Sequence, residues 1–520
     1  METVSPQDRF ESGTQGLEGA RLWLIAILIA AANFVAILDI SIANVSVPNI
    51  SGALGVTPTQ GTWVITSYAV AEAIAVPLTG WLAGRYGAVR VFAMSLAGFG
   101  LSSALCGLAP TFGCLVAFRV VQGLCGGPLI PLSQTLLMTI FPKRLRATAL
   151  GVWAVTTILG PIMGPALGGF LCDAFGWGSI FLVNVPIALI AAFLGWRTLA
   201  GFETSKRIEP MDVVGLVLLI VWVAALQVML DLGRSHAWFS SPLIVGLAVT
   251  AVIGATYFVI WELTARYPIV DLRIFRYRGY SLGLLVLGLA IGAFFSANII
   301  LPLWLQLTMG YTATWAGGAM CLSGLLSLAA APIAAILMNR MDPRRVVCFA
   351  LVFLSANAFI WSFTNTDISF AQIGLWLFLS GAGMPMFLLP LISMNLSGVT
   401  REETAHAAGL QSFVRTMASA IAISMATTLW ENTSNSDHVT LSARLTMTYA
   451  PAIQKLVALH GDGVKPARSM ALYDLLVQRQ AVTLATGHIF QICAGIYALC
   501  AVLVWVIPKP KSAGGIGLLH

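Results

Sequence analysis

The chain has 520 residues, of which 58% are hydrophobic and only 9% are charged, and its mean hydropathy is +0.88. Soluble domains carry about 25% charged residues, so this composition excludes an ordinary soluble protein. The net charge of +7 fits basic loops that face anionic lipid, and it does not indicate a nucleic-acid surface.

Apolar segments long enough to cross a bilayer recur along the whole chain. About 20 apolar residues span the hydrocarbon core as a helix, and a helix satisfies its own backbone groups there. We therefore predict an all-α membrane protein with fourteen transmembrane helices. In chain order the predicted spans are 22–44, 61–83, 88–108, 113–139, 147–172, 178–199, 211–230, 242–263, 280–307, 315–338, 344–363, 370–396, 406–429 and 486–507.

The basic residues predict how these spans are oriented. Of the 28 Lys and Arg residues, 20 lie at the two termini or in or beside every second gap between spans, as Arg85 and Arg90 do around the gap after the second span. Basic loops face the cytoplasm. We therefore expect a multi-pass protein of the bacterial inner membrane with both termini in the cytoplasm.

The second half of the chain weakly repeats the first. Trp63 and Trp315, each preceded by Thr, match at an offset of 252 residues, and the arginine-rich ends of spans two and ten match at nearly the same offset. This pattern predicts two six-helix pseudo-repeats with two helices inserted between them. Parallel repeats are typical of secondary transporters, whose substrate site lies between the halves near the membrane midplane.

The predicted organisation has five parts. A cytoplasmic tail at 1–21 precedes an N-terminal six-helix bundle at 22–199. Residues 200–278 hold the two inserted helices and their linkers, and residues 279–507 form the C-terminal six-helix bundle. That bundle includes a polar periplasmic loop at 430–485 with room for one or two interfacial helices, and a cytoplasmic tail at 508–520 follows it.

Four charged side chains lie well inside predicted spans: Asp39, Glu72, Arg119 and Arg415. A charge at a helix centre costs about 2.5–3.5 kcal/mol on insertion scales, so each is a functional candidate that needs a partner. A carboxyl group can carry protons as its surroundings change, whereas Arg keeps its proton. Asp39 and Glu72 are the candidate proton carriers, with Arg119 as the first-choice partner of Asp39. The competing interpretation is a buried ion pair that fixes helix register.

Polar side chains accompany two of these charges. Tyr68 precedes Glu72 by one turn on the same helical face, which predicts a phenol within reach of the carboxyl group. Gln122 follows Arg119 by three residues and is expected beside the guanidinium.

A Gly-Pro motif stands out in the fifth span. Gly160 and Gly164 belong to a stripe of glycines that recurs every four residues and predicts close helix packing. Pro161 and Pro165 remove backbone donors, which predicts a bent helix.

Several motifs together resemble those of one family. They are Leu38–Pro48 in the first span, Gly80–Arg90 in the following loop region, Phe118–Gly123 in the fourth span, the Gly-Pro motif, and Asp271 within Pro268–Arg276. From about residue 18 to 510 the chain resembles the fourteen-span drug:proton antiporters of the major facilitator superfamily.

The resemblance implies proton-driven export of hydrophobic toxic compounds, that is, multidrug efflux and antibiotic resistance. It implies that Asp39 belongs to the proton pathway, that Arg119 assists its protonation cycle, and that the Gly-Pro motif governs antiport. A periplasmic membrane-fusion adaptor and an outer-membrane channel are further implied as partners of a tripartite efflux system.

The resemblance also implies a gate in the loop motif. Gly80 and Gly87 are its glycines, and Arg85 and Arg90 would latch the cytoplasmic side. The superfamily motif usually has an acid where this chain has Gly84. That departure puts a charge-relay latch centred on this position in doubt.

The substrate cavity is expected between spans 1, 2, 4 and 5 and their repeats 9, 10, 12 and 13. Aromatic rings and Met offer adaptable apolar contacts to varied ligands. The small number of buried acids favours neutral or weakly acidic hydrophobic compounds. The candidate lining residues are Phe34, Tyr68, Gln122, Trp153, Phe295, Asn298, Trp304, Met384, Phe387, Gln411 and Arg415.

Other classes of protein are disfavoured. The sequence has no phosphate-binding loop, no His-Glu-x-x-His pair and no metal-ligand spacing among its eight Cys residues, so we expect neither an enzyme nor a metal or cofactor. Duplicated halves without a repeated selectivity filter disfavour a channel. Two readings remain: a proton-coupled exporter, tripartite or stand-alone, and a membrane scaffold or sensor that has kept the transporter fold.

Overall fold

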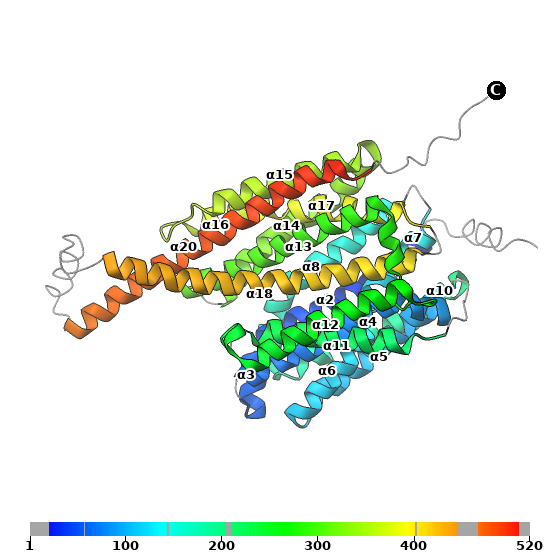
Figure 1. Cartoon of the computed structure of the whole chain (residues 1–520), viewed down its shortest axis with the longest axis horizontal. Coiled ribbons are helices and arrows are strands. Elements are labelled where there is room, and N and C mark those ends of the chain that lie inside the picture. Colours follow the sequence, from blue (N-terminus) through cyan, green and yellow to red (C-terminus); the bar gives the residue numbers. More distant parts are fainter. Residues whose placement is uncertain are drawn as a thin grey trace, which may run out of the picture.

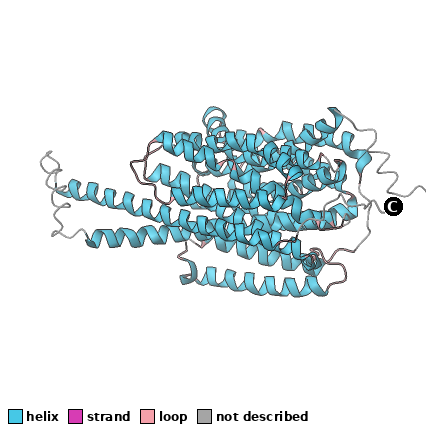
Figure 2. Ribbon diagram, turned by 90° about the horizontal axis from the view of Figure 1, so that it is seen from above, coloured by secondary structure: helices cyan, strands magenta, loops and turns pink. Residues whose placement is uncertain are grey.

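The computed structural model describes residues 20–56, 58–142, 145–203, 210–233, 236–311, 313–400, 403–444 and 466–508. Within these ranges every regular element is helical (Figures 1 and 2), as predicted. The N-terminal half contains α2 Ala20–Leu54, α3 Pro58–Gly61, α4 Trp63–Tyr86, α5 Ala88–Gly107, α6 Phe112–Gly126, α7 Leu129–Ile140, α8 Arg146–Phe175, α9 Ser179–Leu182, α10 Asn184–Leu199 and η1 Ala200–Phe202.

The inserted helices and the C-terminal half follow. The inserted region contains α11 Val213–Leu232, η2 Trp238–Ser240, α12 Pro242–Thr264 and η3 Leu272–Arg276. The second half contains α13 Arg278–Leu307, α14 Ala313–Arg340, α15 Pro343–Trp361, α16 Phe370–Ser380, α17 Gly383–Ser397, α18 Thr404–Arg444, α20 Pro466–Leu503 and η4 Val504–Val506.

The number of membrane crossings agrees with the sequence. In the described ranges, 13 helical segments are long and apolar enough to cross a membrane. The 30-residue helix α8, which packs along α2, supplies the remaining crossing. The predicted fourteen-helix fold is therefore confirmed.

Three predicted spans consist of two helices each. Span four divides at residues 127–128 between α6 and α7, span six at Val183 between α9 and α10, and span twelve at residues 381–382 between α16 and α17. Proline has no N–H, so Pro385 leaves the carbonyl of Gly381, four residues earlier, without a helical donor. Ser327 of α14 donates a hydrogen bond to that carbonyl. A neighbouring helix thus satisfies backbone that the proline leaves unpaired inside the bundle.

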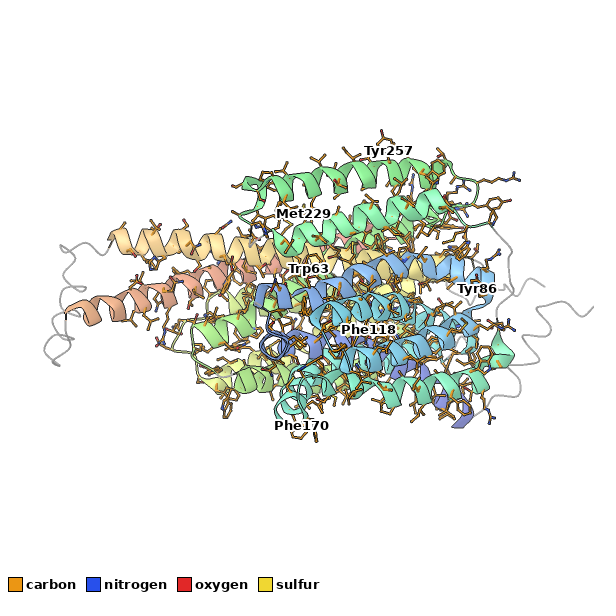
Figure 3. The ribbon with its side chains drawn as sticks, turned by 90° about the horizontal axis from the view of Figure 1, so that it is seen from below. Trp63, Tyr86, Phe118, Phe170, Met229 and Tyr257 are labelled. Atoms are coloured by element: carbon orange, nitrogen blue, oxygen red, sulfur yellow. The ribbon has the colours of Figure 1, made fainter. Side chains whose placement is uncertain are left out.

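The two ends of the bundle differ. We call the end where α4 finishes at Tyr86 and α5 begins the basic end, and the opposite end the hairpin end. Figure 3 shows Tyr86 at the basic end and Trp63, the first residue of α4, toward the other. At the hairpin end α18 and α20 project side by side beyond the other helices (Figures 1 and 2).

This projection corrects the predicted loop at 430–485. Residues 430–444 and 466–485 continue α18 and α20 as helices, where the sequence suggested a polar loop with interfacial helices. Two side-chain contacts join α18 to α20. Trp430 Nε1 donates a hydrogen bond to Thr486 Oγ1 at 2.9 Å, and His438 Nε2 lies 3.0 Å from Asp474 Oδ1. Residues 445–465 lie outside the described chain.

The two halves meet along two seams. In one seam α8 packs against α14, and in the other α4 packs against α18. A Cβ atom placed on Gly151 of α8 would lie 3.7 Å from Ala335 Cβ of α14. In the second seam a Cβ on Gly80 would lie 2.7 Å from His406 Cγ, and a Cβ on Gly409 would lie 3.3 Å from the Val76 carbonyl oxygen. The halves are therefore closed against each other near the basic end.

The inserted helix α11 borders the α4/α18 seam and contacts both halves. Thr66 of α4 donates a hydrogen bond to Asp231 Oδ2 at 2.6 Å. Ser424 of α18 donates to the carbonyl of Leu230 at 3.1 Å. The inserted pair is thus packed into the bundle rather than attached to one half alone.

Candidate functional site

A buried carboxylate–guanidinium pair lies inside the N-terminal half. Arg119 Nη1 of α6 is 2.5 Å from Asp39 Oδ2 of α2, so the contact expected from the sequence is present. The other carboxylate oxygen accepts hydrogen bonds from Gln122 Nε2 at 3.0 Å and from Asn184 Nδ2 at 2.8 Å. Arg119 Nε donates to the Val64 carbonyl at 2.9 Å. Pairing and hydrogen bonding are what a buried charge requires, and this pair has both.

Aromatic rings enclose the guanidinium. Arg119 Cζ lies 4.3 Å from the centre of the Tyr68 ring and 5.4 Å from that of Phe181. Ring faces attract cations, most strongly where water is excluded. These rings therefore help to hold the charge of Arg119 in place.

Tyr68 and Glu72 lie one turn apart on α4, as the sequence predicts. Within the described residues the Tyr68 hydroxyl has no hydrogen-bond partner. Because the ring lies against Arg119, the hydroxyl points toward α6, where a Cβ on Gly126 would lie 2.6 Å from it. Glu72 is buried on α4, with 5% of its side chain exposed.

The glycines of the Gly-Pro motif pack against the part of α2 that carries Asp39. A Cβ on Gly160 would lie 2.6 Å from Ile37 Cγ2, and a Cβ on Gly164 would lie 2.5 Å from Ser41 Cβ. These distances are too short for a side chain, so only glycine allows this approach of α8 to α2. The motif thus allows the backbone of α8 to pack directly against α2 at Ile37 and Ser41, on either side of Asp39.

The two prolines of the motif give less information. Helix α8 continues from Arg146 to Phe175 through both positions. The side chains of Pro161 and Pro165 lie outside the described part of the chain. The bend they predict, and their role in antiport, remain predictions.

Glu203 occupies the loop motif in place of the missing acid. It accepts hydrogen bonds from the backbone N–H groups of Val89 at 3.0 Å and Arg90 at 3.2 Å, and so caps the first turn of α5. Gly87 has φ +97°, and a side chain there would overlap the Glu203 carboxylate. The Glu203 carboxylate, from the end of the N-terminal half, therefore accepts hydrogen bonds in a loop motif whose usual acidic position is Gly84 in this chain.

Arg85 and Gly80 complete this region. Arg85 lies in the last turn of α4, where a cation complements the helix dipole, and its Cζ is 6.0 Å from the centre of the Trp81 ring. Gly80 lets the first turn of α18 approach through His406. The motif therefore touches the opposite half through Gly80, while Arg90 pairs with Glu203 at 3.8 Å within its own half.

The predicted cavity residues come from both halves, and their role as a substrate lining stays a prediction. Trp153 Nε1 donates to Ser133 Oγ at 2.8 Å and Trp304 Nε1 donates to Thr483 Oγ1 at 3.1 Å, so each indole is fixed inside one half. The set divides into buried Tyr68, Gln122, Trp153, Trp304, Met384, Phe387 and Gln411, and half-buried Phe34, Phe295, Asn298 and Arg415.

Sequence reasoning missed Asn184 and Glu203. Asn184 is an amide inside an otherwise apolar span, and polar groups at membrane depth need partners, which was the available signal. Glu203 lies in a short linker among other polar residues, where nothing local distinguishes it from a solvated acid.

A bundle of two six-helix halves with a buried carboxylate–guanidinium pair in one of them is the architecture of a secondary transporter. Residues 29–423 match the Major Facilitator Superfamily, and the chain belongs to this family. It is a multi-pass protein of the bacterial inner membrane. The family predicted from the motifs is confirmed.

Relatives align with nearly the whole chain. The chain is 39% identical over 504 residues to the multidrug export protein EmrB of Escherichia coli, which covers 96% of this chain and 98% of that protein. It is 36% identical over 501 residues to the fatty acid resistance protein FarB of Neisseria gonorrhoeae, covering 96% and 99%.

Solved structures share the fold. The human organic anion transporter MFSD10 matches with a TM-score of 0.58 at 15% identity, covering 96% of this chain and 100% of that chain. The proton:xylose symporter XylE matches with a TM-score of 0.57 at 13% identity, covering 95% and 97%. At this identity the likeness concerns architecture alone.

Proposed function

We propose that this protein is a multidrug efflux transporter that exports hydrophobic toxic compounds in exchange for protons. Its relatives are named for multidrug export and for fatty acid resistance, and they align over nearly their full lengths. The observation that carries the proton coupling is the buried contact of Asp39 with Arg119, at 1% and 0% side-chain exposure.

Asp39 is the proton carrier in this proposal. Ionised, its carboxylate accepts from Arg119, Gln122 and Asn184. A proton placed on either oxygen removes an acceptor site and cancels the attraction to Arg119. Arg119 then keeps its contact with the Tyr68 ring and its hydrogen bond to Val64, so the two states of the site differ in how tightly α2 is held to α6.

Helix α8 connects this site to the opposite half. Its glycines contact α2 on both sides of Asp39, and its first turns meet α14 at Gly151. A change in the position of α2 is therefore transmitted to the α8/α14 seam through rigid packing. That connection couples proton binding to the relative arrangement of the halves, which antiport requires.

The basic end lies in the cytoplasm and the hairpin end in the periplasm, because basic loops are retained on the cytoplasmic side. The projecting α18–α20 pair then extends into the periplasm, where it is available to an adaptor of a tripartite pump. Cross-linking from Val439→Cys in intact cells tests this assembly, since Val439 is 67% exposed on the projection. A captured adaptor supports the tripartite pump, whereas a stand-alone pump gives no such product.

Proton release from dye-loaded proteoliposomes tests the coupling directly. Adding hydrophobic weak acids or dyes under an imposed pH gradient should produce proton flux that disappears in Asp39→Asn. Glu262→Gln is the matched control, because Glu262 is a fully buried carboxyl group on α12, away from the Asp39 cluster. Flux that survives in Asp39→Asn overturns the role of Asp39, and absence of flux with every compound favours the scaffold or sensor.

A further inference from the structure

The two carboxylate oxygens of Asp39 have partners of different kinds. Oδ2 accepts a hydrogen bond from Arg119 Nη1 at 2.5 Å, whereas Oδ1 accepts from two side-chain amides, Gln122 Nε2 at 3.0 Å and Asn184 Nδ2 at 2.8 Å. A guanidinium has five N–H donors and no acceptor, while an amide has both donors and an acceptor. A proton on Oδ2 would therefore face a group that cannot accept it. Among these contacts, only the amides beside Oδ1 can accept the proton of a neutral carboxyl group.

The two amides differ in their freedom to turn over. Gln122 Oε1 already accepts from Arg119 Nη1 at 2.9 Å and lies 3.4 Å from Cys106 Sγ, so turning this amide would set its N–H groups against the guanidinium. Asn184 is fully buried, and its side-chain oxygen has no hydrogen-bond partner among the described residues. A half turn of the Asn184 amide brings this oxygen to Asp39 and, within the described chain, gives up only the hydrogen bond that the amide nitrogen makes there.

We propose that the transported proton resides on Asp39 Oδ1 and that Asn184 is the hydrogen-bond partner of this atom in both protonation states. The proposal rests on the proposed function and deepens it. While Asp39 is ionised, Asn184 Nδ2 donates to Oδ1. When a proton binds Oδ1, the Asn184 amide turns about its last side-chain bond, and the new O–H group donates to the Asn184 oxygen. One hydrogen bond replaces another, and the proton stays on Asp39.

The exchange gives the movement of α2 a direction. Asn184 is the first residue of α10, which packs against α2. The hydrogen bond between α2 and α10 exists in both states, whereas the ionic contact between α2 and α6 exists only while Asp39 is ionised. Protonation therefore loosens α2 on the side of α6 alone. Asn184 is a positioning residue, because it orients the carboxyl group without carrying the proton.

Infrared difference spectra between alkaline and acidic pH test this exchange on the full-length protein in lipid vesicles. The acid carbonyl band of Asp39 is the one that disappears in Asp39→Asn, which separates it from those of other buried carboxyl groups such as Glu72. Asparagine labelled with a heavy carbon isotope at its side-chain carbonyl identifies the amide bands. We expect one labelled amide band to change with pH in the parent, and to be lost in both Asp39→Asn and Asn184→Leu.

Asn33 provides the matched control. It is fully buried on α2, and its side-chain oxygen also has no partner within the described residues. Its amide nitrogen, however, donates to the hydroxyl groups of Thr156 and Thr157 of α8, at 2.9 Å each, and not to Asp39. The amide band that changes with pH should therefore persist in Asn33→Leu.

Proton flux provides a second readout. Asn184→Leu should lower substrate-driven flux by about tenfold, the effect expected when one hydrogen bond to a charged group is lost. Asn184→Gln keeps an amide that can donate and accept, and it should restore part of the flux and the amide band. A purely structural role of Asn184 would affect stability and flux without an amide band that follows the protonation of Asp39.

The labelled parent decides the matter even if Asn184→Leu does not fold. An acid band of Asp39 without any labelled amide change overturns the role of Asn184 and leaves the proposed function intact. A labelled amide band that survives in Asn184→Leu has the same meaning. If no acid band depends on Asp39 at any pH at which the protein stays folded, Asp39 is not the proton carrier, and both proposals fail.

Discussion

Gly164 of α8 and Ser41 of α2 are in contact so close that a Cβ on the glycine would lie 2.5 Å from the serine Cβ. Asp39 lies two residues before Ser41. The contact therefore makes the spacing of α8 and α2 a condition for the position of the buried carboxylate.

Gly164→Ala should separate these helices. Overpacking of this kind costs about 1–3 kcal/mol, so we expect a lower thermal midpoint and a loss of proton flux that depends on Asp39. Gly169→Ala is the matched control, since Gly169 lies on the same helix and a Cβ there has nothing within 4 Å. Equal behaviour of the two variants would contradict the role of the glycine stripe.

Glu203→Ala should destabilise the loop motif more than Arg90→Ala does. Loss of a helix cap costs about 0.5–2 kcal/mol. The ion pair itself is exposed, with 51% of the Arg90 side chain accessible, so its loss should cost less than about 1 kcal/mol. Thermal unfolding in detergent compares the two variants. A larger effect of Arg90→Ala would show that the charge, not the cap, holds this loop.

Trp222→Ala should loosen the inserted helices from the bundle. The Trp222 ring packs 6.0 Å from Phe258 of α12 and 5.8 Å from Phe413 of α18, measured between ring centroids. Truncating such a ring typically costs about 3–5 kcal/mol. Val252→Ala on α12, where the side chain is 66% exposed, should change the thermal midpoint little. Similar midpoints for both variants would mean that α11 contributes no packing to the seam.

A disulfide between Gly151→Cys and Ala335→Cys should stop transport by locking the α8/α14 seam. The relevant Cβ separation is 3.7 Å, which suits a disulfide. Oxidation should abolish flux and a reductant should restore it, while neither single variant should respond. If the cross-linked protein transports at the parent rate, the halves do not part at this seam.

The fold was predictable because the bilayer imposes one period and one length on every span. The breaks within spans were harder to predict from the sequence. Pro128 and Pro385 are visible in the sequence, but whether a proline divides a helix depends on a neighbour such as Ser327, which the sequence does not place. The projecting helices were missed because their polar faces resemble a loop until Trp430 meets Thr486.

The charged pair of the candidate site was predictable, but its uncharged partner Asn184 and the distant acid Glu203 were not. Asp39 and Arg119 were recognisable from the sequence because a charged side chain inside a membrane span is energetically unfavourable unless it has a partner. The position of Tyr68 one turn before Glu72 predicted that the two side chains are neighbours, but it did not reveal that the ring lies against Arg119. Glu203 acts over more than a hundred residues of sequence, at a distance that no local pattern reveals.

Helix α18 runs without interruption from the seam to the tip of the projection, over 41 residues. At 1.5 Å per residue it is about 60 Å long, so a tilt of about 10° at the seam sweeps its far end through roughly 9 Å. A tilt of α18 about its contact at Gly409 is therefore amplified along the helix. A small rearrangement between the halves would displace the projecting end of α18 by several times as much, which another molecule bound there could detect.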